Sequence, residues 1–285
     1  MLEGLPERFA GEFLITHFFN PPRIIRLLEL VSGPKINPGV IATSRDFADR
    51  ALGKIGVVCK DTPGFFGCRI GTYRILVAES EAIAMGLDFE EADAMIGKLF
   101  GIPSTGIFGV LDLVGVDLML TTPRNLQNTL PNTDADHEYG REPLLISRMI
   151  DENRLSRQSG AGISRGSPDR PIREITDVTM GDGRPQRQIA SEGDVREEHP
   201  GLRGRYALVV MKKALAYAAS LVPEVAESPY AVDDAMRTGA ASPSPPISIS
   251  PPREMSTQSQ MASGIVSCLT APLAWWRGER ADDYC

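Results

Sequence analysis

Apolar periodicity divides this chain into segments of different character. Residues 1 to about 152 and residues 206–239 show it, whereas residues 154–205 hold ten arginines, no lysine and many Gly, Ser, Asp and Pro. Residues 242–263 contain seven Ser and five Pro. Because such polar compositions bury too little apolar surface to form a core, we expect packed regions separated by a solvated arginine-rich linker and followed by a disordered tail.

The first 60 residues predict an α/β unit. Residues 13–16, 24–31 and 57–59 are apolar or β-branched and favour strands. The Asn37-Pro38 pair begins a helix that places Phe47 and its apolar neighbours on one side, and Gly53 ends it.

Helical patterns take over after residue 63. Apolar residues recur at helical spacing from Ile70 to Ile83, Asp88 caps a second helix, and further helices are expected near 111–118 and 143–150. This region predicts a small all-α domain.

A later segment repeats part of that pattern. Residues 231–236 (AVDDAM) echo residues 91–95 (EADAM), and each follows a long helical stretch. We interpret residues 204–239 as a partial second copy of the helical unit. The expected organisation is therefore an α/β domain at 1–60, a helical domain at 61–153, a linker at 154–203, a partial repeat at 204–239 and a disordered tail at 240–285.

Charge and cysteine content exclude several classes of function. The net charge of −7 disfavours a polyanion binder, although the arginine-rich 154–205 segment leaves a nucleic-acid arm as a minor alternative to a linker. The four cysteines show no metal-ligand spacing, so no metal site and no disulfide framework is expected. No long uncharged apolar run or signal segment is present, which predicts a cytoplasmic protein without membrane contact.

One histidine and one carboxylate stand out. His17 ends an apolar strand and precedes two phenylalanines, and Glu29 is the one charged residue in the apolar run 27–31. A buried carboxylate needs a partner, and His17 is the natural one if the two strands are neighbours. A His–Glu pair suits a general base, whereas the alternative is a core histidine with satisfied hydrogen bonds.

These residues carry a resemblance to a known family. The run 17–22 (HFFNPP), the downstream Glu29 and the run 60–65 (KDTPGF) resemble NAD-dependent 3-hydroxyacyl-CoA dehydrogenase. The resemblance covers about residues 4–165, and the repeat at 204–239 is similar to the tandem C-terminal domains of longer bacterial members.

The resemblance implies a two-domain enzyme of fatty acid β-oxidation that oxidises the 3-hydroxyl of an acyl-CoA with NAD. In this reading residues 1–60 are the end of a Rossmann domain, and the helical domain closes over 3-hydroxyacyl-CoA and forms a homodimer. His17 would be the catalytic base and Glu29 its orienting partner. Asn20 and Cys68 would be substrate-binding, with Cys68 at the asparagine position of the family's Pro-Gly-Phe-x-x-Asn-Arg pattern and Arg69 at its arginine.

Two differences from the family pattern affect the expected activity. Cys68 lacks the paired donor and acceptor of an amide. The family's Gly-x-Gly-x-x-Gly turn, which holds the NAD pyrophosphate, should precede residue 1, so no cofactor-binding residue is assigned. We therefore expect a truncated or frame-shifted product with impaired activity. The alternative is a non-catalytic dimerisation or acyl-CoA-binding module derived from the family.

Overall fold

The structure is a computed structural model that describes the two packed regions most fully. The described residues are 4, 6–20, 22–96, 106–109, 111, 115–116, 118–139, 149–155, 163–165, 174–176, 183–185 and 200–239. The chain divides into one unit of Met1–Ile70 with Leu215–Cys285 and a second unit of Gly71–Ala214. The tail expected at 240–285 and most of the linker expected at 154–203 lie outside the described residues.

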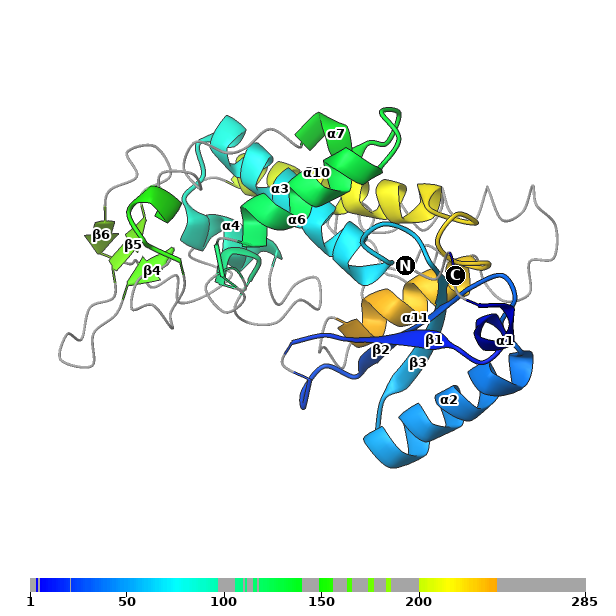
Figure 1. Ribbon diagram of the computed structural model, residues 1–285. Coiled ribbons are helices and arrows are strands. Elements are labelled where there is room, and N and C mark those ends of the chain that lie inside the picture. Colours follow the sequence, from blue (N-terminus) through cyan, green and yellow to red (C-terminus); the bar gives the residue numbers. More distant parts are fainter. Residues whose placement is uncertain are drawn as a thin grey trace, which may run out of the picture. The chain divides into compact units, whose positions relative to one another are not determined.

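A three-stranded sheet forms the centre of the first unit (Figure 1). Strand β1 (Leu14–Phe18) pairs antiparallel with β2 (Leu27–Ser32), which pairs parallel with β3 (Ile55–Lys60). A short helix, α1 (Glu7–Ala10), precedes the sheet. The predicted strands are confirmed, with boundaries that differ by up to three residues.

Helices α2 (Pro38–Leu52) and α11 (Pro229–Gly239) pack against β2 and β3 and lie on opposite sides of the sheet in Figure 1. The Asn37 side chain caps α2 by accepting from Gly39 N at 2.9 Å, and Gly53 ends it in the left-handed conformation at φ 63°. Both helix boundaries agree with the sequence prediction.

The face of the sheet toward α2 is a small apolar core. Leu28, Leu30 and Ala48 are buried there, and Leu14 and Val58 pack against them. Phe47, which the sequence places with apolar neighbours on one side of α2, is 59% exposed. Only Ala48 of this helix is buried, so a single small side chain brings α2 close to the sheet.

The opposite face of the sheet is closed by the returning C-terminal segment of the first unit. Lys60 anchors this segment, since its backbone N–H donates to Val225 O at 2.9 Å and its Nζ donates to Pro223 O at 2.8 Å. The same Nζ lies 2.7 Å from Glu227 Oε1. These contacts hold α11 against the sheet across a large gap in the sequence.

Helices make up most of the described second unit. Helix α3 (Gly67–Met85) ends at Gly86, which has φ 65°, and α4 (Phe89–Ile96) follows. Helix α10 (Pro200–Ser220) packs against α3, because Tyr206 OH donates to Ala78 O at 3.1 Å and Lys213 Nζ donates to Glu81 Oε1 at 2.7 Å. Helices α3 and α10 both contribute residues to the two units.

The remaining helices differ from the prediction. Of the helix expected through Leu111 and Leu118, the described residues 108, 109 and 111 are helical, Gly115 has φ 115°, and helix α6 (Leu118–Thr129) begins at Leu118. Helix α7 (Asp136–Tyr139) was not predicted. Of the helix expected at 143–150, residues 143–148 lie outside the described part.

A second small sheet occurs within the segment expected to be a linker. Strands β4 (Ser164–Arg165), β5 (Glu174–Thr176) and β6 (Gly183–Pro185) pair antiparallel in the order β4-β5-β6.

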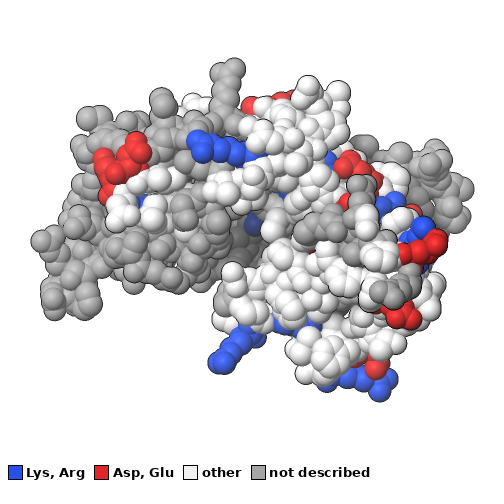
Figure 2. Space-filling model, in the orientation of Figure 1, with Lys and Arg blue, Asp and Glu red and all other residues white. Residues whose placement is uncertain are grey.

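The described helices include none with the length and hydropathy needed to cross a membrane. On the side of the molecule that Figure 2 shows, basic and acidic side chains are interspersed over the described surface.

Candidate active site

His17 and Glu29 are directly opposite each other in the register of β1 and β2. Residues paired in this way point to the same face of an antiparallel sheet, which here is the face away from the α2 core. Nδ1 of His17 lies 2.6 Å from Oε2 of Glu29. Glu29 is fully buried, whereas the His17 side chain is 28% exposed, so the pair has one buried end and one accessible end.

The second carboxylate oxygen of Glu29 binds the start of α3. Oε1 accepts from Gly67 N at 2.6 Å and from Phe66 N at 3.1 Å. A buried carboxylate costs several kcal/mol unless it is paired and hydrogen-bonded, and an anion is favoured at a helix N-terminus. Glu29 therefore fixes the imidazole of His17 and the first turn of α3 at the same time.

Two aromatic rings hold the imidazole from its sides. The Phe19 ring meets it edge-on with centroids 4.7 Å apart, and the Phe65 ring lies at 5.3 Å. Phe65 has φ 51°, which is strained for a bulky residue, and it follows Gly64 at φ 73°. The turn at Gly64 and Phe65 therefore places the Phe65 ring beside His17 and the Phe66 and Gly67 amides beside Glu29.

Cys68 lies at the other nitrogen of the imidazole. Its Sγ is 3.9 Å from Nε2 of His17, and the residue is partly exposed. Asn20, which the resemblance also places at the substrate, is exposed two residues beyond β1, and the described contacts of the His17–Glu29 pair do not include it. The structure thus brings together three of the four predicted site residues.

The environment of His17 favours its protonated form. The hydrogen bond to Cys68 and the one to Glu29 raise the pKa of His17 to about 10, although burial acts in the opposite direction. The imidazole therefore keeps its proton at neutral pH. The sequence predicts a base that works near neutral pH, because the effect of Cys68 on this imidazole depends on a contact that appears only in the fold.

Sequence reasoning missed the role of Arg69, which it named only as a motif position. Arg69 is fully buried, donates through Nε to Tyr217 OH at 3.0 Å and pairs with Glu224 at 2.6 Å. A buried arginine must be paired, and this requirement is the signal that could have indicated the structural role of Arg69. Arg69 ties the first turn of α3 to the end of α10.

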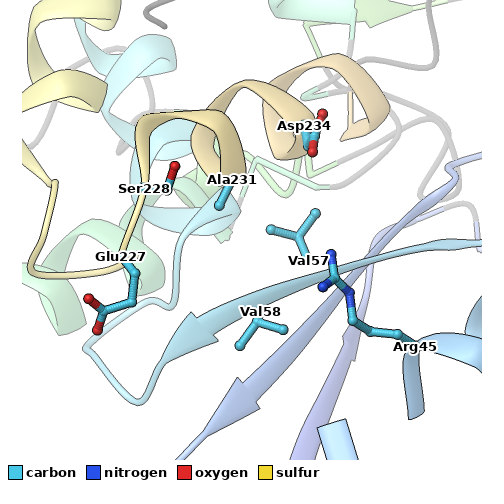
Figure 3. A pocket seen from close by; sticks show the side chains of 7 residues that line it. All are labelled: Arg45, Val57, Val58, Glu227, Ser228, Ala231 and Asp234. Atoms are coloured by element: carbon cyan, nitrogen blue, oxygen red, sulfur yellow. The ribbon is translucent and has the colours of Figure 1, made fainter. Parts of the chain in front are cut away.

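A separate pocket of about 180 Å³ opens at β3 (Figure 3). Val57 and Val58 of β3, Arg45 of α2, and Ala231 and Asp234 of α11 line it, together with Glu227 and Ser228. It shares no residue with the His17 site. Within the described residues, no cluster of three or more His, Cys, Asp or Glu side chains could hold a metal ion.

Comparisons with known proteins match most of this chain to one enzyme family. Residues 5–62 match the model of the 3-hydroxyacyl-CoA dehydrogenase NAD binding domain, and residues 64–166 match that of the 3-hydroxyacyl-CoA dehydrogenase C-terminal domain. A "Putative fatty acid oxidation complex trifunctional enzyme" of Rickettsia felis is 33% identical over 242 residues, which cover 83% of this chain and 34% of that protein.

A second relative and a solved structure extend the comparison. The "Probable 3-hydroxyacyl-CoA dehydrogenase" of Bacillus subtilis is 30% identical over 84% of this chain and 32% of its own length. The chain thus spans about a third of the length of these curated relatives. The crystal structure of 3-hydroxybutyryl-CoA dehydrogenase from Escherichia coli K12 has the same fold, with a TM-score of 0.59 and 18% identity over 95% of this chain and 68% of that one. The chain belongs to the 3-hydroxyacyl-CoA dehydrogenase family, whose cofactor is NAD.

Proposed function

We propose that this chain acts in the interconversion of 3-hydroxyacyl-CoA and 3-oxoacyl-CoA in fatty acid oxidation. His17 would be the group that moves the proton of the 3-hydroxyl. The single observation that carries this proposal is the 2.6 Å bond between His17 Nδ1 and the buried Glu29, which leaves Nε2 as the nitrogen available for proton transfer. General acid–base catalysis of this kind contributes a factor of about 10² to 10⁴ in rate.

The site supports a defined proton path. In the oxidation direction the neutral Nε2 accepts the hydroxyl proton, and Glu29 stabilises the imidazolium that forms. In the reduction direction the imidazolium donates a proton to the oxygen of the 3-oxo group. Because the pKa of His17 is raised to about 10, the donor form is the one present at neutral pH. We infer that Cys68 biases the site toward reduction at neutral pH.

The described residues do not fit the pyrophosphate of NAD. A dinucleotide normally binds where a strand leads through a glycine-rich turn into a helix N-terminus. At the start of α2 the Asn37 side chain already accepts the Gly39 amide, and at the start of α3 Glu29 accepts the Phe66 and Gly67 amides. NAD supplies hydride acceptance when bound in this family, and the present residues are assigned the proton transfer alone.

The family-model boundaries support the proposed domain division. They separate an NAD-binding part at 5–62 from a C-terminal part at 64–166, close to the expected division at residues 60 and 61. The helical repeat at 204–239 and a homodimer through the helical domain remain proposals. The non-catalytic module is not favoured, because the His17–Glu29 pair is intact.

Two measurements test the proposed function. Binding of 3-hydroxybutyryl-CoA to the full chain should shift the NMR signals of the His17 ring. NADH formation should be low with the chain alone and should appear when a glycine-rich dinucleotide-binding unit is joined ahead of it, with loss of about 10² to 10⁴ in rate on His17→Ala. Absence of binding, or a fused protein whose turnover survives His17→Ala, would contradict the proposal.

A further inference from the structure

The proposed dehydrogenase function gives the thiol of Cys68 no bond-forming step, yet that thiol is aligned with the His17–Glu29 pair. The three side chains form a row in which Glu29 Oε2 binds Nδ1 at 2.6 Å and Nε2 faces Cys68 Sγ at 3.9 Å. The imidazole therefore has one nitrogen on the carboxylate and the other on the thiol. A nucleophile, a base and a group that orients the base occur in this order in cysteine and serine acyl-transfer enzymes.

The position of Cys68 in the fold adds to this alignment. It is the second residue of α3, a helix of 19 residues, where the helix dipole favours a negative charge on sulfur. An imidazolium at His17 has the same effect from the other side. Glu29 accepts the amides of Phe66 and Gly67, and the Cys68 amide is the next N–H of a helix first turn, whose N–H groups have no intrahelical acceptor and are the kind of donor that binds an oxyanion.

Exposure separates Cys68 from the other described cysteine. Cys59 is only 2% exposed within β3, and burial raises its pKa far above that of a free thiol. Cys68 is partly exposed and has the imidazole as its neighbour. One chain therefore contains an inert buried thiol and an accessible aligned thiol, which serve as an internal comparison.

We propose that Cys68, His17 and Glu29 form a nucleophilic triad that transfers the acyl group of an acyl-CoA thioester to the Cys68 sulfur. The thiolate of Cys68 attacks the thioester carbonyl, and a C–S bond forms as the carbonyl becomes an oxyanion. The oxyanion collapses, the bond to the CoA sulfur breaks, and the CoA thiolate takes the proton from His17 Nε2. Attack by CoA reverses each step, so no oxidant or further reactant is needed. Only the choice of acyl-CoA as electrophile rests on the proposed function.

Alkylation tests the triad without acyl-CoA. In the full chain with Cys268→Ser and Cys285→Ser, iodoacetamide at about pH 6.5 should label Cys68 roughly tenfold faster than it labels glutathione, because ordinary thiols are almost wholly protonated there. Cys59 should stay unlabelled. His17→Gln should slow the labelling of Cys68 by about the same factor, and Glu29→Gln should slow it less. Labelling of Cys68 at the glutathione rate, or a rate unchanged by His17→Gln in a folded variant, would overturn the triad.

Acyl transfer is tested by intact-protein mass spectrometry with acetoacetyl-CoA. The chain should gain one acyl group, which peptide mapping places on Cys68 and hydroxylamine removes. Cys68→Asn should abolish the adduct while keeping the residue that the family pattern has at this position. No adduct on a chain that binds 3-hydroxybutyryl-CoA would overturn acyl transfer and leave the proposed dehydrogenase function standing. No binding at all would instead contradict the proposed function.

Discussion

Glu29 accepts hydrogen bonds from His17 and from the first turn of α3, so one buried carboxylate joins the sheet to the helix that carries Cys68. The pairing follows from strand register, since His17 and Glu29 face each other across β1 and β2. Site geometry and the stability of the first unit therefore depend on the same side chain.

Replacing Glu29 with Leu should lower the free energy of unfolding by about 3–5 kcal/mol. The substitution leaves the buried Phe66 amide, the partly buried Gly67 amide and the His17 Nδ1 without an acceptor, and each unsatisfied buried group costs about 1–3 kcal/mol. Glu29→Gln keeps one acceptor oxygen and should cost less. Urea unfolding measures both, with the exposed Glu7→Gln as a control that should change stability by less than about 0.5 kcal/mol. Equal stability of Glu29→Leu and wild type would show that the carboxylate is not integral to the fold.

Replacing Cys68 with Asn should shift the pH dependence of oxidation to lower pH. The hydrogen bond to Cys68 is the largest cause of the raised pKa of His17, and only the deprotonated imidazole accepts the hydroxyl proton. In the protein with a dinucleotide-binding unit joined ahead of it, the rate of 3-hydroxybutyryl-CoA oxidation should rise with pH toward about 10. In Cys68→Asn the same rise in rate should occur at lower pH. Rate against pH for the two proteins checks this. A rise at the same pH in both would contradict the assigned role of the thiol.

Replacing Gly67 with Ala should disturb the site through Phe19. A Cβ at Gly67 would overlap Cζ and Cε1 of the Phe19 ring, which contacts the His17 imidazole. We expect the free energy of unfolding to fall by about 1–3 kcal/mol and the NMR signals of the His17 ring to shift less on binding 3-hydroxybutyryl-CoA. Gly71→Ala in the same helix is the matched control, since its Cβ meets nothing within 4 Å, and it should be neutral or stabilise by up to about 1 kcal/mol. The idea fails if the two variants behave alike.

Replacing Glu79 with Gln should change how stability depends on pH. Glu79 is buried in α3, its carboxylate oxygens have no hydrogen-bond partner among the described residues, and burial raises its pKa to about 8. The folded state therefore holds the proton more tightly than the unfolded state, so stability is greatest below about pH 4.5 and falls as pH rises through about 8.

Denaturant unfolding at about pH 5 and about pH 9 checks this expectation. From about pH 5 to about pH 9, the free energy of unfolding of wild type should fall by a few kcal/mol relative to that of Glu79→Gln. Glu138→Gln, a substitution of an exposed residue, is the control, and its free energy of unfolding should change between the two pH values as that of wild type does. A constant difference between wild type and Glu79→Gln across this range would show that the carboxylate is not held in a desolvated position.

The pairing of His17 with Glu29 was predictable, because a single carboxylate in an apolar strand demands a partner and antiparallel strands place opposite residues on one face. The strands and α2 were predictable for similar local reasons, through the Asn37 cap and Gly53. The exposure of Phe47 was not, because a helix pattern does not reveal how little of the helix the sheet covers.

The third member of the site could not be derived from local patterns. Cys68 entered the prediction only through the family resemblance, and its approach to Nε2 depends on the turn at Phe65, whose φ of 51° no propensity favours. The same turn delivers the amides of Phe66 and Gly67 to Glu29. Strands β4–β6 were missed because each has only two or three residues.

NMR titration of the His17 ring in the full chain, with His137→Gln and His199→Gln to remove the other imidazole signals, tests most directly whether Glu29 and Cys68 hold a proton on this side chain. The ring should stay protonated through neutral pH and titrate near 10, and both Glu29→Gln and Cys68→Asn should move the titration toward 6.5. A wild-type ring that titrates near 6.5, and that neither substitution moves, would contradict the coupling of the three side chains on which the site depends.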